Sequence, residues 1–247
     1  MAEEETLRLN RYLALAGLGS RRACEVLIAN GEVEINGRIV TNLATQVKPS
    51  DEVHVGGKEV SASRLQTIVL HKPPGVICTR SDPKGRPTVY SLVAPQHKKL
   101  HYVGRLDIES EGLLVMTNDG DLTQRLTHPS HKVEKEYIVT LDHPCRSERV
   151  AELLEGIQLE EGLAKAEAIH VISPRRMVMV LQQGMNRQIR RMFEHLDLKV
   201  ERLIRVRIGN LVLPDLKMGK WRVLDPREIA KLTETWSRRK KGSEPAR

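Results

Sequence analysis

Several features that define large classes of proteins are scarce in this sequence. Aromatic residues make up only 3% of its 247 residues, with Phe193 the single phenylalanine, so a broad platform for stacking unpaired bases is not expected. The three cysteines form no Cys-x-x-Cys pair, which argues against a disulfide framework or zinc ribbon and fits a reducing cytoplasm. The apolar runs are far shorter than the roughly 20 residues of a membrane span. The opening MAEEETLRLN is acidic and polar, unlike a secretory signal.

Positive charge, by contrast, is in excess. Lysine and arginine outnumber the acidic residues and give a formal net charge of +8. The usual anionic partners of such a protein are nucleic acid and membrane surfaces. Extra lysine and arginine can also serve solubility alone. The charge therefore favours an anionic partner, and the motifs must identify it.

The first 60 residues have the pattern of a small α+β module. Apolar residues recur at helical spacing in RLNRYLALAG, which predicts a first helix. Ser20 stands where the N-cap of a second helix is expected, and Asn30-Gly31 is a suitable C-terminal stop. The following VEINGRIV alternates around Asn36-Gly37, the strongest short-range signal of a β-hairpin.

Basic side chains gather on this module. They lie on or between the two predicted helices and near the hairpin, where they could form a phosphate-binding face. A solvated helix surface would give the same pattern. Together with the hairpin turn, the candidate residues of such a phosphate-binding face are Arg8, Arg11, Arg21, Arg22, Asn36, Gly37 and Arg38, with Lys48 close by.

The rest of the chain predicts a second, larger domain. SASRLQ, residues 61–66, is a short polar linker, and strands alternate with helices through residues 67–235. RSERVAELLEG is typical of a short amphipathic helix, and two strands are predicted on either side of Pro174. Residues 236–247 form a charged tail with no reason to fold. We expect an α+β fold with a small module at residues 1–60.

A helix is predicted after Gly184, in NRQIRRMFEHLD. Its apolar residues fall on one face at 100° per residue: Ile189, Met192, Phe193 and Leu196. The same projection puts Arg187, Arg190 and Arg191 together on the opposite face. We expect this helix to be buried on one side and to present three guanidinium groups on the other.

An acidic stretch stands out in this basic chain. GRLDIESEGLLVMTNDG, residues 104–120, and the residue after it contain five carboxylates: Asp107, Glu109, Glu111, Asp119 and Asp121. Three interpretations compete. The stretch could be a divalent-metal site, a set of loop residues, or one catalytic carboxylate among structural ones.

The metal site is the least favoured of the three. Alternating carboxylates share a face only in an extended segment, and Gly112 followed by LLVM predicts that the strand begins after the acids. His128 and His131 are three apart and separated by a proline, a poor arrangement for metal ligands. We predict no metal site. Four of the acids are interpreted as loop residues, and Asp107, just beyond YVGRL, as a lone nucleophile or general base.

These motifs resemble two known families. LNRYLALAGLGSRRACEVLIANGEVEINGRIV is similar to the small RNA-binding module named after ribosomal small-subunit protein four. GRLDIESEGLLVMTNDG closely resembles the catalytic motif of the ribosomal pseudouridine synthases of the RsuA type. HPSHKVEKEYIV, GMNRQIRRMFEHL and RLIRVRIGNLVLPDLKMGKWRVL resemble further motifs of that family in the same order. The resemblance covers about residues 7–235.

The resemblance implies a fold, an activity and a set of site residues. The fold would be a mixed, mainly antiparallel sheet flanked by helices. The activity would be isomerisation of uridine to pseudouridine in ribosomal RNA, without cofactor or metal. Asp107 would be the essential carboxylate, which attacks the sugar, attacks the ring or deprotonates the sugar. Tyr137 would stack on the flipped base, Arg190 would pair with Asp107, and Arg105 would fill the gap left by the base.

The branch of the family and two other functions stay open. CTRSDPKGRPTVY favours the RluB-like branch, which acts on large-subunit ribosomal RNA, whereas an apolar residue at Met185 is more typical of RluF-like members. The alternatives are a non-catalytic ribosome-associated RNA-binding or assembly factor and a magnesium-dependent nuclease. We expect a monomer by default.

Overall fold

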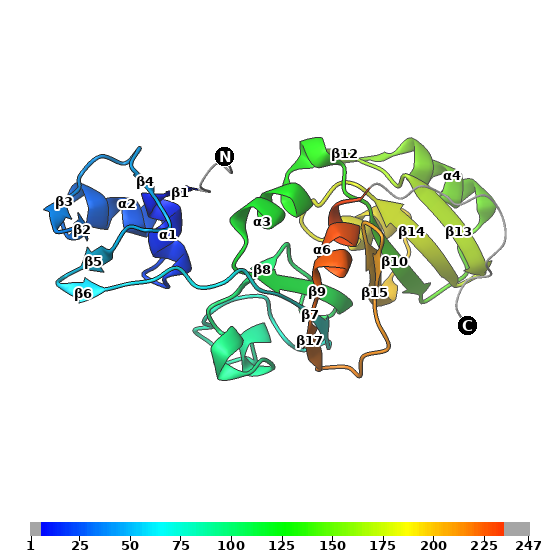
Figure 1. Cartoon of the computed structure of the whole chain (residues 1–247). Helices are drawn as coiled ribbons and strands as arrows, with labels where there is room; N and C mark the ends of the chain where they lie inside the picture. The colour runs from blue at the N-terminus through cyan, green and yellow to red at the C-terminus, as the bar shows by residue number, and fades with distance from the viewer. Residues whose placement is uncertain (1–5, 235–247) are drawn as a thin grey trace. The chain divides into compact units, whose positions relative to one another are not determined.

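The computed structural model describes residues 6–234, which divide into two compact units between Leu65 and Gln66 (Figure 1). The charged tail expected at 236–247 lies outside the described residues. The boundary falls within the predicted linker, in a stretch without helix or strand. Within residues 6–234, no helix combines the length and apolar character needed to cross a membrane.

The first unit packs two helices against short strands around a small apolar core. The hydroxyl of Ser20 accepts a hydrogen bond from the amide of Ala23 at 3.2 Å, so the predicted N-cap is confirmed. Asn36 and Gly37 have φ of 51° and 75°, as a tight hairpin turn requires. The elements are β1 (Leu7–Arg8), α1 (Leu9–Leu15), α2 (Arg21–Ala29), β2 (Val33–Ile35), β3 (Arg38–Ile39), β4 (Gln46–Val47), β5 (Val53–Val55) and β6 (Lys58–Glu59).

The second unit is built on a nine-stranded sheet with the order β13-β14-β10-β15-β9-β7-β17, to which β8 and β16 add. Strand β15 pairs with β9 in parallel, and the other pairings of this sheet are antiparallel. The expected mixed, mainly antiparallel sheet is confirmed. Its strands are β7 (Thr67–Lys72), β8 (His101–Val103), β9 (Glu111–Thr117), β10 (Lys135–Leu141), β13 (Ala168–Ser173), β14 (Arg176–Leu181), β15 (Val200–Ile208), β16 (Leu211–Val212) and β17 (Trp221–Val223).

Helices pack on this sheet through separate apolar clusters. Ile189, Met192 and Phe193 of α5 are buried against β10 and β14, as their spacing predicts. Another cluster joins α3 and α6 to β8 and β9. The remaining elements are η1 (Val89–Ser91), η2 (Pro95–His97), α3 (Gly120–Thr127), η3 (Pro129–His131), α4 (Ser147–Glu155), β11 (Ile157–Leu159), β12 (Gly162–Ala164), α5 (Gln188–His195) and α6 (Pro226–Thr233).

Two local predictions in the acidic stretch are wrong. Asp119 and Asp121 are not simple loop residues, because the Asp119 carboxylate accepts hydrogen bonds from the amides of Asp121 and Leu122 and so caps α3, whose first turn contains Asp121. The strand also begins earlier than expected, at Glu111. The Glu111 side chain is 5% exposed and pairs with Arg202 of β15, so an acidic residue starts a strand that is otherwise apolar.

The parallel pairing of β9 and β15 depends on a glycine. Gly112 has φ of 110° and is the register partner of Arg205. A Cβ atom at this position would lie 2.3 Å from the carbonyl oxygen of Arg205 and 2.7 Å from its nitrogen. The two backbones approach too closely for any side chain at residue 112, so the contact between the two strands requires glycine.

We predict that Gly112→Ala destabilises the second unit by about 3 kcal/mol or more, because the added methyl group meets backbone and the φ is unfavourable. The control is Gly85→Ala. Gly85 also has a positive φ, 68°, but open space around its Cβ, and should cost only about 1–2 kcal/mol. Trp221, on β17, packs against an apolar cluster of the second unit, so tryptophan fluorescence during urea unfolding reports on this unit. Equal losses for the two variants would contradict the close approach.

Candidate active site

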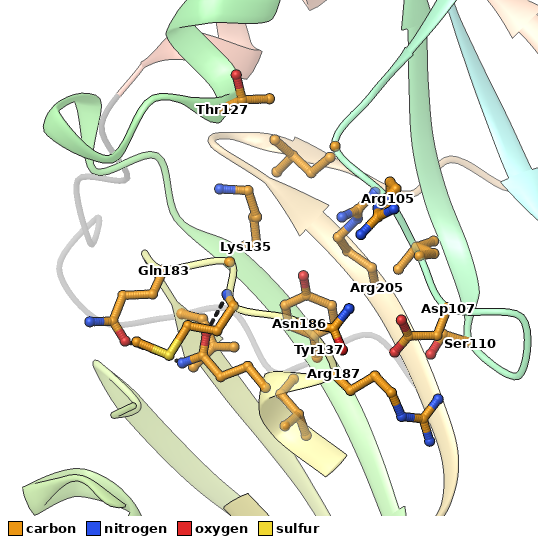
Figure 2. Close-up of a pocket in the computed structure, with 18 of the residues that line it drawn as sticks. Arg105, Asp107, Ser110, Thr127, Lys135, Tyr137, Gln183, Asn186, Arg187 and Arg205 are labelled. Carbon is orange, nitrogen blue, oxygen red and sulfur yellow. Dashed lines mark hydrogen bonds between the residues drawn. The ribbon is translucent and has the colours of Figure 1, made fainter. Parts of the chain in front are cut away.

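A cavity of about 380 Å³ opens in the second unit beside strands β10 and β15. The loop at 104–107 and the loop before α5 form much of its lining (Figure 2). Among the predicted site residues, the ones that line it are Arg105, Asp107, Tyr137 and Arg187. The sequence therefore identified residues from three distant segments that the fold brings together.

A buried lysine fixes the backbone of the loop that carries Asp107. Lys72, at the end of β7, is 0% exposed. Its ammonium group donates hydrogen bonds to the carbonyl oxygens of Asp107 at 3.0 Å and Ser110 at 2.7 Å. It also donates to Pro73 at 3.0 Å and to Ile108 at 3.5 Å. Burial lowers the pKa of Lys72, and nearby groups including Asp107 act in the opposite direction.

Backbone hydrogen bonds complete the hold on this loop. The Gly75 amide, in the turn after Lys72, donates to the Ile108 carbonyl at 2.7 Å, and the Ser110 amide donates to the Asp107 carbonyl at 3.1 Å. Within the part of the chain that the structure describes, the Asp107 carboxylate itself makes no hydrogen bond or ion pair. The backbone of the loop is thus fixed, and the carboxylate is left available at the cavity (Figure 2).

Tyr137 comes from β10, where its register partner on β15 is Arg205. The ring packs against the apolar cluster beneath the cavity and lines the cavity together with Asp107. Figure 2 shows its hydroxyl directed into the open space. An aromatic ring and a free carboxylate thus face one cavity, which can hold a flat ring against the tyrosine.

Arg190 does not form the expected ion pair with Asp107. Among residues 6–234, Arg190 is 7% exposed, and its guanidinium donates to the carbonyl of Val200 at 2.8 Å instead of pairing with Asp107. It reaches the hydroxyl of Ser110 at 3.5 Å. Burial lowers the pKa of Arg190, while the charges of Glu109 and Asp107 act to raise it. Arg190 therefore contacts the Asp107 loop through Ser110 and not through the carboxylate.

The predicted face of three guanidinium groups is also wrong. Helix α5 begins only at Gln188, and Arg187 is its N-cap with a left-handed φ of 45°, so the helical projection does not apply to it. Arg187 pairs with Glu109 at 3.0 Å. Arg191 pairs with Glu161 at 2.6 Å, which lowers the pKa of that carboxyl to about 2. The three arginines therefore have different partners and do not form one basic face.

Two cavity residues were missed in the sequence, Lys135 and Arg205. Burial, and then the charge of Arg205, lower the pKa of Lys135 to about 8. Arg205 is 2% exposed and donates from Nε to the carbonyl of Leu113 at 2.7 Å. A signal was present: Lys135 alternates with Tyr137 on one strand, and an arginine inside the apolar stretch RLIRVRIG is unusual.

The candidate residues of the first unit are mostly at its surface. Arg8, Arg21, Arg22 and Arg38 are exposed, and Arg11 is half-buried. The Asn36 side chain is engaged in the fold instead. It donates to the carboxylate of Asp51 at 2.9 Å and accepts from the amide of Glu52 at 3.0 Å. Gly37 completes the turn with φ of 75°. Within residues 6–234 no cluster of three or more His, Cys, Asp or Glu has a metal-binding arrangement.

Comparison with known proteins identifies the family to which the chain belongs. Residues 66–195 match the family described as RNA pseudouridylate synthase, and residues 7–53 match the S4 domain. The chain belongs to the RNA pseudouridylate synthase family and carries an S4 domain before the synthase domain. The resemblance stated from the motifs is confirmed.

The chain is also similar to individual proteins of this family. The chain is 39% identical over 240 residues to "Ribosomal large subunit pseudouridine synthase B" of Pseudomonas aeruginosa, covering 92% of this chain but only 62% of that relative's length. It is 36% identical over 231 residues to the Bacillus subtilis protein of the same name, covering 91% of this chain and 95% of the relative. A solved "pseudouridylate synthase" superposes with a TM-score of 0.67 at 34% identity, over 92% of this chain and 99% of that one.

We predict that Lys72→Met destabilises the second unit by about 3 kcal/mol, because the buried carbonyls at Asp107 and Ser110 lose their donor. Amide exchange at Gly75 and Ser110 should accelerate as the loop loosens. Urea unfolding and hydrogen exchange measure both effects. Lys199→Met, at an exposed lysine, is the control and should be neutral. Unchanged exchange at Gly75 and Ser110 in Lys72→Met would show that the lysine does not hold the loop.

We also predict a pH-dependent contribution from Lys135. Its pKa is about 8 in the folded chain and near the usual 10.5 when unfolded. Between these values the unfolded state binds more protons, so the free energy of unfolding rises with pH. The stability of wild type relative to Lys135→Met should therefore increase by about 2 kcal/mol from pH 7.5 to 10. Urea titrations across this range measure it, and a flat difference would contradict the burial of a charged amine.

Proposed function

We propose that this protein isomerises uridine to pseudouridine in ribosomal RNA of the large subunit. The observation that carries the proposal is the pairing of a free carboxylate, Asp107, with an aromatic ring, Tyr137, across one cavity. A cavity of about 380 Å³ is within the range of about 300–1,000 Å³ typical of small-molecule sites. The names of the relatives support the large-subunit substrate.

In this proposal the residues take distinct roles. Asp107 acts as the nucleophile or base that starts the detachment of uracil, and Tyr137 stacks on the flipped base. Arg190 is a positioning residue, which contacts the Asp107 loop through Ser110. Arg105, exposed at the rim, enters the gap that the flipped base leaves in the RNA.

The basic surfaces supply the binding energy for base flipping. Extruding a base costs roughly a few kcal/mol, and phosphate contacts offset that cost. We assign such contacts to Arg187 at the cavity and to the S4 domain, through its exposed Arg8, Arg21, Arg22 and Arg38. Arg11 is half-buried and contributes less. Because Arg191 pairs with Glu161, it has the weakest case among the proposed contacts.

The test is tritium release from large-subunit ribosomal RNA that is transcribed without modification and labelled at carbon 5 of uridine. We expect release by wild type in the presence of chelator. Asp107→Asn should reduce it by about 10³-fold or more, because the essential carboxylate is lost. RNA affinity should change by less than about threefold. Asp121→Asn, at an exposed carboxylate of the same stretch, is the matched control and should retain full activity.

Other outcomes would point to the rival functions. Tight binding by wild type without release, from naked transcripts and from large-subunit precursor particles alike, would indicate an assembly factor. Chain cleavage that appears only with magnesium would indicate a nuclease. Release that Asp107→Asn preserves would keep the activity and remove Asp107 from the catalytic role.

A further inference from the structure

Two cationic side chains face the cavity and form no ion pair with any residue that the structure describes. Lys135 and Arg205 both line it, on the neighbouring strands β10 and β15, and Figure 2 shows their charged groups on the same side as the open space. The ammonium group of Lys135 donates to the carbonyl of Val133 at 3.0 Å. Among residues 6–234, the buried Nη2 of Arg205 has no hydrogen-bond partner. Donors of both residues are thus left for something else.

On the opposite face of the same strands, a buried arginine is neutralised by acidic side chains. Arg207 follows Arg205 by two residues but lies across a register shift of β15 against β10, so the two side chains face opposite sides. Arg207 is 2% exposed. It pairs with Glu136 at 2.9 Å and Glu134 at 3.3 Å and donates to the carbonyl of Gly209 at 2.7 Å. Alternation along β10 places these acids away from Lys135. Within the described residues, no carboxylate forms an ion pair with Lys135 or Arg205.

Binding of an anion would stabilise these two cationic side chains. Two like charges at close range in a partly buried site repel each other, and the charge of Arg205 contributes to the lowered pKa of Lys135. A neutral uracil carbonyl could accept a hydrogen bond from either group but would not offset the repulsion. A phosphodiester carries the required negative charge and several acceptor oxygens. RNA presents one at every nucleotide.

We propose that Lys135 and Arg205 form a phosphate subsite within the cavity, which binds a backbone phosphate next to the flipped uridine. The inference rests on the proposed function for the identity of the RNA. The subsite holds the nucleotide from its backbone while Tyr137 and Asp107 receive its base. Lys135 is therefore a positioning residue that acts on substrate binding, distinct from any group that moves a proton.

The first experiment leaves the protein unchanged except at Asp107. An RNA stem-loop that contains the mapped target uridine is made with single neutral methylphosphonates at each phosphate around it. Asp107→Asn is used so that the substrate is not consumed. One methylphosphonate next to the target should weaken binding about tenfold, and remote ones should have little effect. Equal effects at all positions would overturn the subsite.

The second experiment assigns the phosphate to Lys135. In Lys135→Met, the sensitive methylphosphonate should lose its effect, because the contact is already absent. The dependence of log Kd on log salt should become shallower by about 0.7–0.9, the value of one phosphate contact. Lys135→Arg keeps the charge and should restore both. Lys199→Met, an exposed lysine outside the cavity, should leave both unchanged.

Steady-state kinetics distinguish the proposed role of Lys135 in substrate binding from a role in proton transfer. With the otherwise wild-type enzyme, Lys135→Met should raise KM about tenfold and leave kcat within about threefold. A fall in kcat of about 10²-fold that Lys135→Arg does not restore would make Lys135 a proton-transfer group instead. Absence of tritium release by wild type would refute the proposed function alone, because the salt dependence of RNA binding by wild type, Lys135→Met and Lys135→Arg needs no mapped uridine and still tests the subsite.

Discussion

The position of the Asp107 loop depends on the buried ammonium group of Lys72. Lys72 is fully buried, and its ammonium group donates to backbone carbonyls, two of them at Asp107 and Ser110. Placing a charge there is costly, and its carbonyl partners offset that cost because charge-assisted hydrogen bonds are strong in a low dielectric. The end of β7 is thereby joined to the segment that leads into β9. The Asp107 loop is fixed through its backbone before any substrate is present.

The two faces of the central strands use charge in opposite ways. On one face Arg207 is enclosed by Glu134 and Glu136 and is structurally complete. On the cavity face, Lys135 and Arg205 keep donors free next to Asp107 and Tyr137. An acidic stretch within a basic chain is consistent with this arrangement. Most of its acids pair with arginines or cap a helix, and a single carboxylate remains at the cavity.

Sequence reasoning succeeded where the physics is local. The Ser20 cap, the Asn36-Gly37 turn and the apolar face of α5 each depend on residues a few positions apart. It failed where partners are distant: Lys72 contacts residues more than thirty positions away, and Arg205 bonds to Leu113 across the sheet. The position of Asp107 after an apolar strand made it a candidate, but only the family resemblance gave roles to Asp107 and Tyr137, because no local pattern separates a reactive aspartate from a loop aspartate.

The unexpected place of Arg190 fits the same physical scheme. An arginine paired directly with Asp107 would occupy carboxylate oxygens that the structure leaves available at the cavity. Instead, Arg190 donates to the carbonyl of Val200 and reaches the hydroxyl of Ser110, so it contacts the Asp107 loop without covering the carboxylate. The charge of Asp107 still acts to raise the pKa of Arg190, against the larger effect of burial. The two groups therefore attract each other without a direct ion pair, and the carboxylate stays open to the cavity.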